Sequence, residues 1–275
     1  MSMKTYTTIL LAAQRPGITN PIAEHYNVSH KCLAPVNGIP MVERVLTTLL
    51  ASDHIEHVVL SIEDPDILRA LPMIEELYQA GAVSFAESKK NLSASVIHAI
   101  QTMGGNKMPF LITTADNCFH TTEMIDHFLN DIDQANAEAA WGMAADTLVQ
   151  DTYPGTGKIT GQHKLRDGIW SNCNIYAVCS ERALASIEIF KGGGQFGNKK
   201  KRKAMIPMIG FWAFFLYRYG LVSLNGLAAQ ASRVFKIRAH AVKMPFADAP
   251  IDADDLPSLQ FIEQNLIERE GKATI

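Results

Sequence analysis

The sequence predicts an α/β fold built on a doubly wound, mostly parallel sheet with a small antiparallel elaboration. Short apolar runs, typical of strands buried on both faces, occur at 8–13, 57–62 and 109–115. Segments with apolar residues at helical spacing alternate with these runs, and such alternation is typical of parallel sheets. The chain has 275 residues without an internal repeat or a linker, which indicates one domain spanning 1–275.

The first half of the chain alternates strand and helix signals. The segment 41–52 is a helix candidate because its apolar residues fall on one face: Met41, Val45, Leu46, Leu49 and Leu50. A second helix candidate covers 66–80, and Pro72 is expected to start or kink it. We also expect a strand at 81–85 and a helix running to residue 103, whose N-cap is Asn91 or Ser93.

The second half continues this pattern less regularly. The segment 151–168 is rich in glycine, lysine and turn residues, which predicts the antiparallel excursion. Around it we expect a helix at 121–134, strands at 138–144, 174–178 and 235–242, and a closing helix.

The most apolar stretch, 204–217, follows a run of five basic residues at 199–203. Arg218 ends it after 14 residues, whereas a helix that spans a bilayer needs roughly 20. We therefore expect a helix buried in the protein, and membrane contact is not favoured. The alternative is a helix lying on a membrane surface, with the basic run in contact with anionic lipid.

Charge and cysteine usage argue against several classes of protein. A net charge of −3 gives no electrostatic reason to expect binding to nucleic acid. The cysteines form no Cys-x-x-Cys pair, so free thiols are expected rather than a zinc site or disulfides: Cys32, Cys118, Cys173 and Cys179. The first residues lack the apolar core and cleavage site of a signal peptide, so we expect a cytoplasmic protein.

Charged residues follow two of the predicted strands, and open α/β sheets bind ligands at the carboxyl ends of their strands. Asp116 comes directly after the strand at 109–115, where a carboxylate can hold a hard cation or cap the next helix. Its position alone leaves both roles open. Arg15 and Lys31 lie after the first strand and are placed to meet a charged ligand. The histidines show no metal-ligand spacing, so oxygen ligands favour Mg²⁺ over zinc.

The amino-terminal residues carry a resemblance to a known family. Leu11-Ala12-Ala13, then Gln14-Arg15-Pro16-Gly17, then Lys31-x-Leu33-x-Pro35-x-x-Gly38-x-Pro40-Met41 resembles the signature of the nucleotidyltransferases. More narrowly, it is similar to the branch of the molybdenum-cofactor guanylyltransferases. The resemblance covers nearly the whole chain and implies a Rossmann-like fold of the GT-A type. One residue departs from the pattern, since the family usually has glycine where this chain has Gln14.

The resemblance implies roles for single residues. Asp116 would hold Mg²⁺, and Asp254, with Asp252 on the same side of an extended segment, would complete the metal site. The alternative is that this segment caps the last helix, through Asp254 or Asp255. Lys31 and Arg15 would be catalytic, because they would neutralise the charge of a triphosphate.

Two further sets of residues are implied as binding sites. The nucleotide-binding set consists of Leu11, Ala12, Ala13, Gln14, Ser93 and Ser95. Helix capping is the alternative for the two serines, which lie at a helix start. The acceptor-binding set consists of Lys158, Asn174, Lys201, Arg202 and Lys203, and a solvated loop is the alternative for the lysine run.

The function implied is that of an Mg²⁺-dependent nucleotidyltransferase, which moves a nucleotidyl group from an NTP to a phosphorylated small molecule and releases pyrophosphate. Candidate acceptors are molybdopterin, a sugar or polyol phosphate, and a phosphorylated lipid-headgroup precursor. One alternative is a GT-A-type glycosyltransferase, which typically carries Asp-x-Asp after the metal strand, whereas this chain reads Asp116-Asn117-Cys118. The other is a catalytically degenerate nucleotide-binding or membrane-associated protein, suggested by Gln14 and by 199–217.

Overall fold

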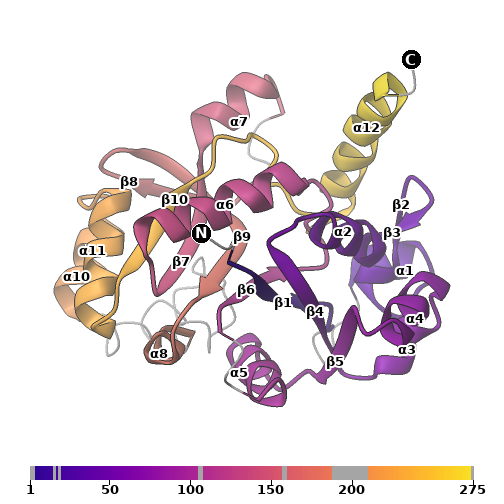
Figure 1. Ribbon diagram of the computed structural model, residues 1–275. Coiled ribbons are helices and arrows are strands. Elements are labelled where there is room, and N and C mark those ends of the chain that lie inside the picture. Colours follow the sequence, from indigo (N-terminus) through magenta and orange to yellow (C-terminus); the bar gives the residue numbers. More distant parts are fainter. Residues whose placement is uncertain are drawn as a thin grey trace.

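One mixed sheet forms the centre of the molecule (Figure 1). The computed structural model describes residues 4–14, 17, 20–104, 108–156, 160–187 and 210–273. Within these ranges the sheet has eight strands. Seven of them follow the order β10 (Ala239–Lys243), β7 (Ala139–Ala145), β9 (Gly168–Val178), β6 (Phe110–Thr114), β1 (Tyr6–Leu11), β4 (Ile55–Ile62), β5 (Val83–Glu87). The eighth, β8 (Gln162–Leu165), pairs with β9 beside this path.

Most neighbouring strands run parallel. β1 is parallel to β4 and β6, β4 to β5, and β7 to β10. β9 lies between β6 and β7 and is antiparallel to both, and β8 is antiparallel to β9. The carboxyl ends of β1, β4, β5, β6 and β7 therefore share one edge of the sheet with the amino end of β9. The mostly parallel sheet and its antiparallel part, both predicted from the sequence, are confirmed.

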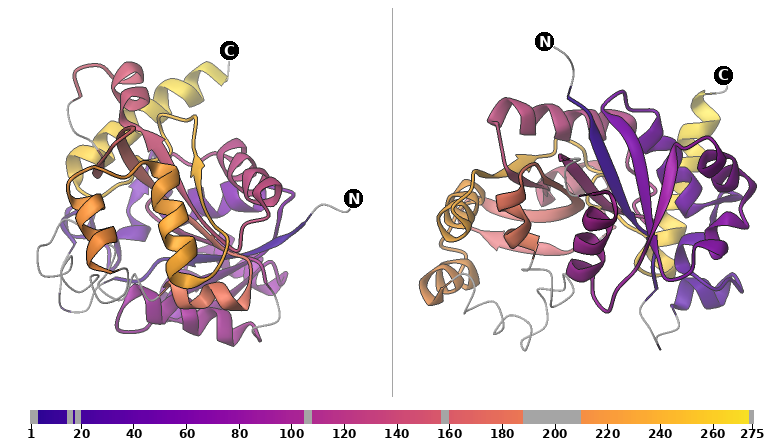
Figure 2. Two further views of the ribbon diagram at one scale, coloured as in Figure 1. Left: turned by 90° about the vertical axis from the view of Figure 1, so that its left-hand side faces the viewer. Right: turned by 60° about the horizontal axis from the view of Figure 1, so that its bottom comes forward.

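Helices cover both faces of this sheet (Figures 1 and 2). On one face, α2 (Met41–Leu50) and α6 (Thr122–Ala135) bury their apolar sides against the strands. On the other face, α5 (Leu92–Thr102) does the same, together with α8 (Leu184–Ile187), which follows the short turn η2 (Glu181–Ala183). This is the doubly wound arrangement that the alternation of strands and helices predicts.

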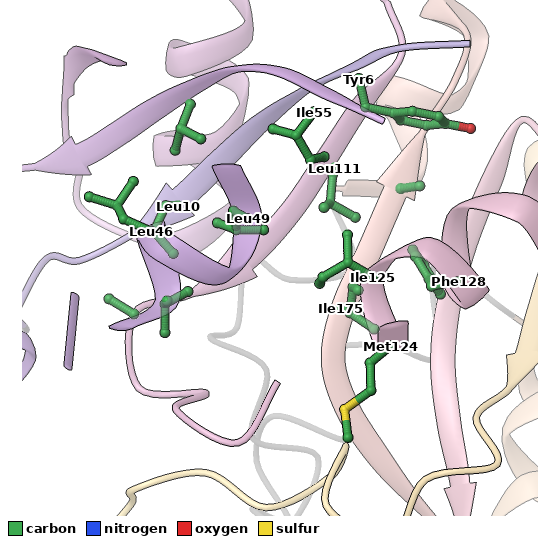
Figure 3. Packing of buried hydrophobic residues seen from close by; sticks show 14 of the residues in the cluster. Tyr6, Leu10, Leu46, Leu49, Ile55, Leu111, Met124, Ile125, Phe128 and Ile175 are labelled. Carbon is green, nitrogen blue, oxygen red and sulfur yellow. The ribbon is translucent and has the colours of Figure 1, made fainter. Parts of the chain in front are cut away.

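The larger hydrophobic cluster lies between the sheet and the pair α2 and α6 (Figure 3). It contains Leu10 of β1, Leu111 of β6, Leu46 of α2 and Phe128 of α6, all fully buried. Each such side chain contributes about 1.5–3 kcal/mol by leaving water. Ile9, the neighbour of Leu10, belongs to the cluster on the opposite face. The first strand is thus buried on both sides, which is why its sequence is a continuous apolar run.

The connection from β1 to α2 is built from short elements. α1 (Pro21–His25) and the 3-10 turn η1 (Lys31–Leu33) lead into a hairpin of β2 (Pro35–Val36) and β3 (Ile39–Pro40). Asn37 and Gly38 join these two strands with φ angles of 49° and 78°. Positive φ at both central residues is typical of a tight hairpin turn. The hairpin fixes the entry to α2, so that η1 is held at the carboxyl edge of the sheet.

Pro72 starts a helix, in agreement with the sequence. The segment predicted as one helix at 66–80 holds two, α3 (Pro65–Arg69) and α4 (Pro72–Gln79). The carboxylate of Asp64 caps the first of them by accepting a hydrogen bond from the backbone of Asp66. Proline lacks the N–H that a helix interior needs but is tolerated in a first turn, so the chain breaks before Pro72.

The antiparallel excursion is larger than the sequence predicts. A helix that was not expected, α7 (Asp146–Thr152), follows β7 directly. β9 begins at Gly168 rather than near residue 174. Polar side chains at 171, 172 and 174 interrupt its apolar pattern, and for this reason the sequence shows only the carboxyl half of the strand.

The apolar stretch 204–217 is described only in part. Residues 204–209 lie outside the described ranges, and the remainder begins α10 (Phe211–Arg218). Trp212 is 72% exposed, and Tyr219, just after the helix, is 64% exposed. The prediction of a buried helix is therefore wrong for Trp212, whereas Leu216 and Tyr217 of the same helix are half-buried against a hydrophobic cluster. Among the described residues, no helix combines the length and the apolarity needed to cross a bilayer.

The carboxyl-terminal part of the chain adds one more strand to the sheet, and the segment after that strand passes along the carboxyl edge of the sheet. α11 (Leu224–Phe235) packs beside the edge strand β10 (Figure 2). Lys236, with a φ of 54°, ends this helix, so β10 begins at Ala239 rather than near residue 235. The closing helix α12 (Leu256–Ala273) is confirmed. Its Leu259 and Ile262 pack against Ile22 and Phe119 in a third hydrophobic cluster.

Candidate active site

Asp116 lies at the carboxyl edge of the sheet, two residues after the end of β6. Its carboxylate accepts hydrogen bonds from the ammonium of Lys31 and from the hydroxyl of Thr114. Burial would raise the pKa of Asp116, but the Lys31 charge and these hydrogen bonds outweigh burial and hold that pKa below its ordinary value. Asp116 is therefore a largely buried, ionised carboxylate, with its side chain 14% exposed.

Lys31 belongs to the turn η1, which lies beside the end of β1, where Sγ of Cys32 donates to the carbonyl of Ala12 over 3.4 Å. Besides its contact with Asp116, its Nζ lies 3.9 Å from Oδ1 of Asp254. Burial would lower the pKa of Lys31, yet the carboxylate of Asp116 outweighs burial and raises that pKa above its ordinary value. The lysine is thus a fixed positive charge within a group of carboxylates.

The segment between β10 and α12 brings two more carboxylates to this place. The backbone N–H of Ala253 donates to the carbonyl of Asp116 over 3.1 Å, and Nε2 of His120 donates to the carbonyl of Ala249 over 3.0 Å. These two contacts tie the segment to the loop after β6. Ala253 is fully buried and its two neighbours, the aspartates, project toward Asp116, as the alternation in the sequence predicts.

Asp116, Asp252 and Asp254 together form a candidate cation site. Each offers a carboxylate oxygen, and these three oxygens lie within 4.8 Å of one another. Burial, together with the nearby charges of Asp116 and Asp254, raises the pKa of Asp252 to about 8. Such crowding of like charges is relieved by a bound cation, and a set made only of oxygen donors fits Mg²⁺. The residues present therefore fit the metal that the sequence predicts.

Residues at the end of β1 line the same edge. The N–H of Ala12 donates to the carbonyl of Ser61 over 3.0 Å, and the N–H of Gln14 donates to Oε1 of Glu63 over 3.3 Å. The same oxygen of Glu63 lies 2.9 Å from Nε2 of His30. Our sequence analysis missed Glu63 and His30. The signal for Glu63 was present, because it directly follows the apolar strand at 57–62 just as Asp116 follows its own strand.

The two serines lie in the first turns of α5, and Ser95 is hydrogen-bonded to the segment that precedes the helix. The N-cap is Asn91, whose side chain accepts from the N–H of Ala94 over 2.9 Å. Oγ of Ser95 accepts from the N–H of Lys89 over 2.8 Å. Ser93 is fully buried, and within the described residues its Oγ has no hydrogen-bond partner. Both serines thus lie beside the carboxyl end of β5, and neither hydroxyl faces solvent.

Asn174, predicted as an acceptor contact, lies beside the aspartates. Its Nδ2 donates to Oδ2 of Asp252 over 2.7 Å. Five other predicted site residues lie outside the described ranges: Arg15, Lys158, Lys201, Arg202 and Lys203. Of the predicted set, the structure therefore gathers Lys31, Asp116, Asn174 and the Asp252/Asp254 pair at one point.

The carboxyl edge of this mostly parallel sheet carries a half-buried lysine and an acidic cluster, and open α/β sheets bind their ligands at this edge. The sequence profile of the family described as "MobA-like NTP transferase domain" matches residues 24–194, which is more than half of the chain. The chain belongs to this family. The matched range contains Lys31, Asp116 and Asn174.

Solved structures share the fold. A hypothetical transferase from Thermus thermophilus is 21% identical, with a TM-score of 0.71, and the match covers 93% of this chain and 99% of that one. The 4-diphosphocytidyl-2C-methyl-D-erythritol synthase of Anaerococcus prevotii is 12% identical, with a TM-score of 0.55 and coverages of 96% and 99%. A CMP:2-keto-3-deoxy-manno-octonic acid synthetase complexed with CTP gives the same identity and TM-score, with coverages of 96% and 100%. No curated protein matches the chain.

Proposed function

We propose that this protein transfers a nucleotidyl group from an NTP to a phosphorylated small molecule, with Mg²⁺ as cofactor and pyrophosphate as the second product. The observation that carries this proposal is the convergence of Lys31 with Asp116, Asp252 and Asp254 at the carboxyl edge of the sheet. Family membership supports an NTP as the donor. A protein of the same fold whose structure contains CTP is in line with this donor.

The three aspartates would hold Mg²⁺, which, when bound, would offset the negative charge that develops on the transferring phosphate. Their oxygens are already close together, so little rearrangement of the chain is needed. Asp116 is fixed by Thr114, and Asp252 by Asn174. Held in this way, the carboxylates are preorganised for a cation rather than assembled by it.

Lys31 would neutralise the triphosphate. Its ammonium lies among the carboxylates in the free protein, and a phosphate oxygen of the nucleotide would offer it a second anionic partner. Arg15 would act beside it, a role that rests on its place in the loop after β1. Because the transferred group needs positioning and charge neutralisation more than covalent help, these cations are the main catalytic groups.

The nucleotide would lie across the ends of β1 and β4. Leu11, Ala12, Ala13 and Gln14 end the first strand there and would contact base and phosphates through their backbone. Ser93 and Ser95 would border the same subsite from the start of α5. The family usually has glycine at position 14, which lets backbone amides come close to the nucleotide. In this chain the side-chain amide of Gln14 would take part in that contact.

The acceptor would attack through a phosphate oxygen. That oxygen forms a bond to the α-phosphorus while the bond from the α-phosphorus to the bridging oxygen breaks, and pyrophosphate leaves with the electron pair. A phosphate with its second pKa near ~6 is largely ionised at neutral pH, so the reaction requires no general base. Lys158, Lys201, Arg202 and Lys203 would provide positive charge for this phosphate, which is a proposal from the sequence alone.

The test is a screen of the four NTPs against phosphorylated acceptors, including sugar and polyol phosphates, a phosphorylated lipid headgroup and molybdopterin, read by release of pyrophosphate. We expect one pair to give Mg²⁺-dependent turnover, and Asp116→Asn to lose nearly all of it while remaining folded. Turnover with a nucleotide-sugar in place of an NTP would contradict the proposal. So would full activity of Asp116→Asn.

A further inference from the structure

Asn174 occupies an irregular point in the middle of the sheet. The pairing of β9 with β7 shifts there, so that Trp141 faces Tyr176 but Met143 faces Asn172. Asn174 lies within this bulge with a φ of 51°, in the left-handed region. Asparagine tolerates that conformation better than most residues. Bulges often redirect a side chain next to a functional site, and here the redirected side chain is that of Asn174.

Neighbouring groups fix the orientation of the Asn174 amide. Asn172 donates from Nδ2 to Oδ1 of Asn174 over 3.3 Å, and its own Oδ1 accepts from the N–H of Asn174 over 3.2 Å. The same Nδ2 of Asn172 also donates to the hydroxyl of Tyr176. Because Oδ1 of Asn174 is used as an acceptor on that side, its NH₂ group is directed to Asp252.

The contact leaves Asp252 oriented toward the other carboxylates. Nδ2 of Asn174 donates a hydrogen bond to only one carboxylate oxygen of Asp252, Oδ2, over 2.7 Å. Asp116, Asp252 and Asp254 still offer oxygens within 4.8 Å of one another. A neutral donor on a metal-binding carboxylate is the usual way in which proteins orient such ligands, because it restricts rotation without competing for the cation.

We propose that Asn174 is a positioning residue, whose amide orients the carboxylate of Asp252 toward the cation site, rather than a contact for the acceptor. This inference rests on the proposed function only in that Asp252 must be a cation ligand. It differs from the role that the sequence implies, because Asn174 acts through Asp252 and not on the substrate.

The experiment uses Mn²⁺ alone as the probe, with binding followed by the electron paramagnetic resonance of free Mn²⁺. Asn174→Gly removes the amide, while glycine keeps a φ of 51° without strain. Asn136→Gly is the matched control, since Asn136 is an exposed residue with a φ of 47° at the end of α6. We expect Asn174→Gly to weaken Mn²⁺ binding by about 10- to 100-fold, as removal of an outer partner of a ligand typically does, and Asn136→Gly to leave it unchanged.

Two results would overturn the inference. The first is Mn²⁺ binding by Asn174→Gly equal to that of the wild type, in a protein for which Asp252→Asn does weaken binding. The second is equal binding by the wild type and Asp252→Asn, which would overturn the proposed metal site as well. If Asn174→Gly does not fold, Asn172→Ala is the second variant. It keeps the amide of Asn174 but removes the Asn172 side chain that fixes the orientation of this amide. An Mn²⁺ affinity equal to that of the wild type in Asn172→Ala would contradict the inference.

Discussion

At the scale of single residues, Lys31 is placed where it competes with a divalent cation. Its ammonium contacts Asp116 and lies 3.9 Å from Asp254, and both of these carboxylates belong to the candidate cation site. The lysine therefore balances part of the negative charge while no nucleotide is bound. Replacement of Lys31 should therefore lower turnover while leaving cation binding as tight or tighter. Replacement of a surface lysine should change neither.

We expect Lys31→Met to lower turnover by about 10²–10³-fold, the typical loss when one preorganised electrostatic donor is removed. The same variant should bind Mn²⁺ at least as tightly as the wild type in the absence of NTP, because a repelling charge is gone. Lys89→Met, which removes an ammonium paired with Glu87 outside the acidic cluster, is the control. Wild-type turnover, or weaker Mn²⁺ binding, in Lys31→Met would contradict the assignment.

The raised pKa of Asp252 predicts that cation binding depends on pH. This pKa of about 8 is raised by burial and by the charges of Asp116 and Asp254, so the metal-free protein holds a proton there at pH 7. Mg²⁺ binds the ionised form, and its affinity should therefore rise as the pH increases toward 8 and level off above it. Each Mg²⁺ bound at pH 7 should release close to one proton.

Isothermal titration in buffers of different ionisation enthalpy measures that proton release. In Asp252→Asn the release should disappear, since the amide does not titrate in this range. Proton release that persists undiminished in this variant would show that another group is responsible.

At the scale of elements, the bulge in β9 depends on a glycine in the facing strand. A Cβ at Gly142 of β7 would lie 2.6 Å from Cγ2 of Ile175 and 3.3 Å from Cγ of Met244. Real Cβ atoms do not approach so closely, so any larger residue would push Ile175 and the bulge with it. Since Asn174 is the neighbour of Ile175, this packing also sets the position of a site residue.

Gly142→Ala should accordingly destabilise the protein by about 1–3 kcal/mol, the usual cost of overpacking a core. Denaturant unfolding measures this loss. Gly161→Ala is the control, because a Cβ there meets nothing within 4 Å. Ile175→Ala alone should also lower the free energy of unfolding. In the double variant Gly142→Ala/Ile175→Ala the losses of the two single variants should not add, because truncation of Ile175 removes the clash. Strict additivity would mean that the two side chains do not compete for space.

At the scale of the whole molecule, Glu138 joins three distant parts of the chain. It directly precedes β7, and its carboxylate accepts from Arg182 of η2 over 2.8 Å, from Ser180 over 3.0 Å and from the N–H of Arg238 over 3.0 Å. These hydrogen bonds, that from Arg182 above all, lower the pKa of Glu138 to about 2. The end of β9 and the start of β10 are thus tied to the start of β7.

A lowered pKa in the folded state means that the unfolded chain takes up the proton first. The stabilisation by Glu138 is therefore fully present above the unfolded pKa of about 4.3 and is lost as the pH falls toward 2. Glu138→Gln should have a lower melting temperature at pH 7 and a smaller decline between pH 4.5 and 2 than the wild type. Glu24→Gln, at an exposed position on α1, should match the wild type in both. Identical acid profiles for Glu138→Gln and the wild type would refute this account.

The sequence by itself determined the sheet, the edge at which its charged residues gather and several residues of the candidate site. Continuous apolar runs predict strands buried on both faces, and parallel strands place Asp116 and Lys31 at one edge. The alternation Asp252-Ala253-Asp254 predicts that both aspartates face the same side, and their oxygens do approach that of Asp116. These features depend on local periodicity, which a sequence displays directly.

Only the tertiary structure decided what depends on contacts between distant segments. The hydrogen bond between Asn174 and Asp252 joins residues 78 positions apart, and no local sequence pattern predicts it. The same holds for Glu63 and His30, which meet across the ends of β4 and the loop after β1. The exposure of Trp212 in an apolar run is a further example, since apolar sequence predicts burial only where other segments supply a surface to cover it.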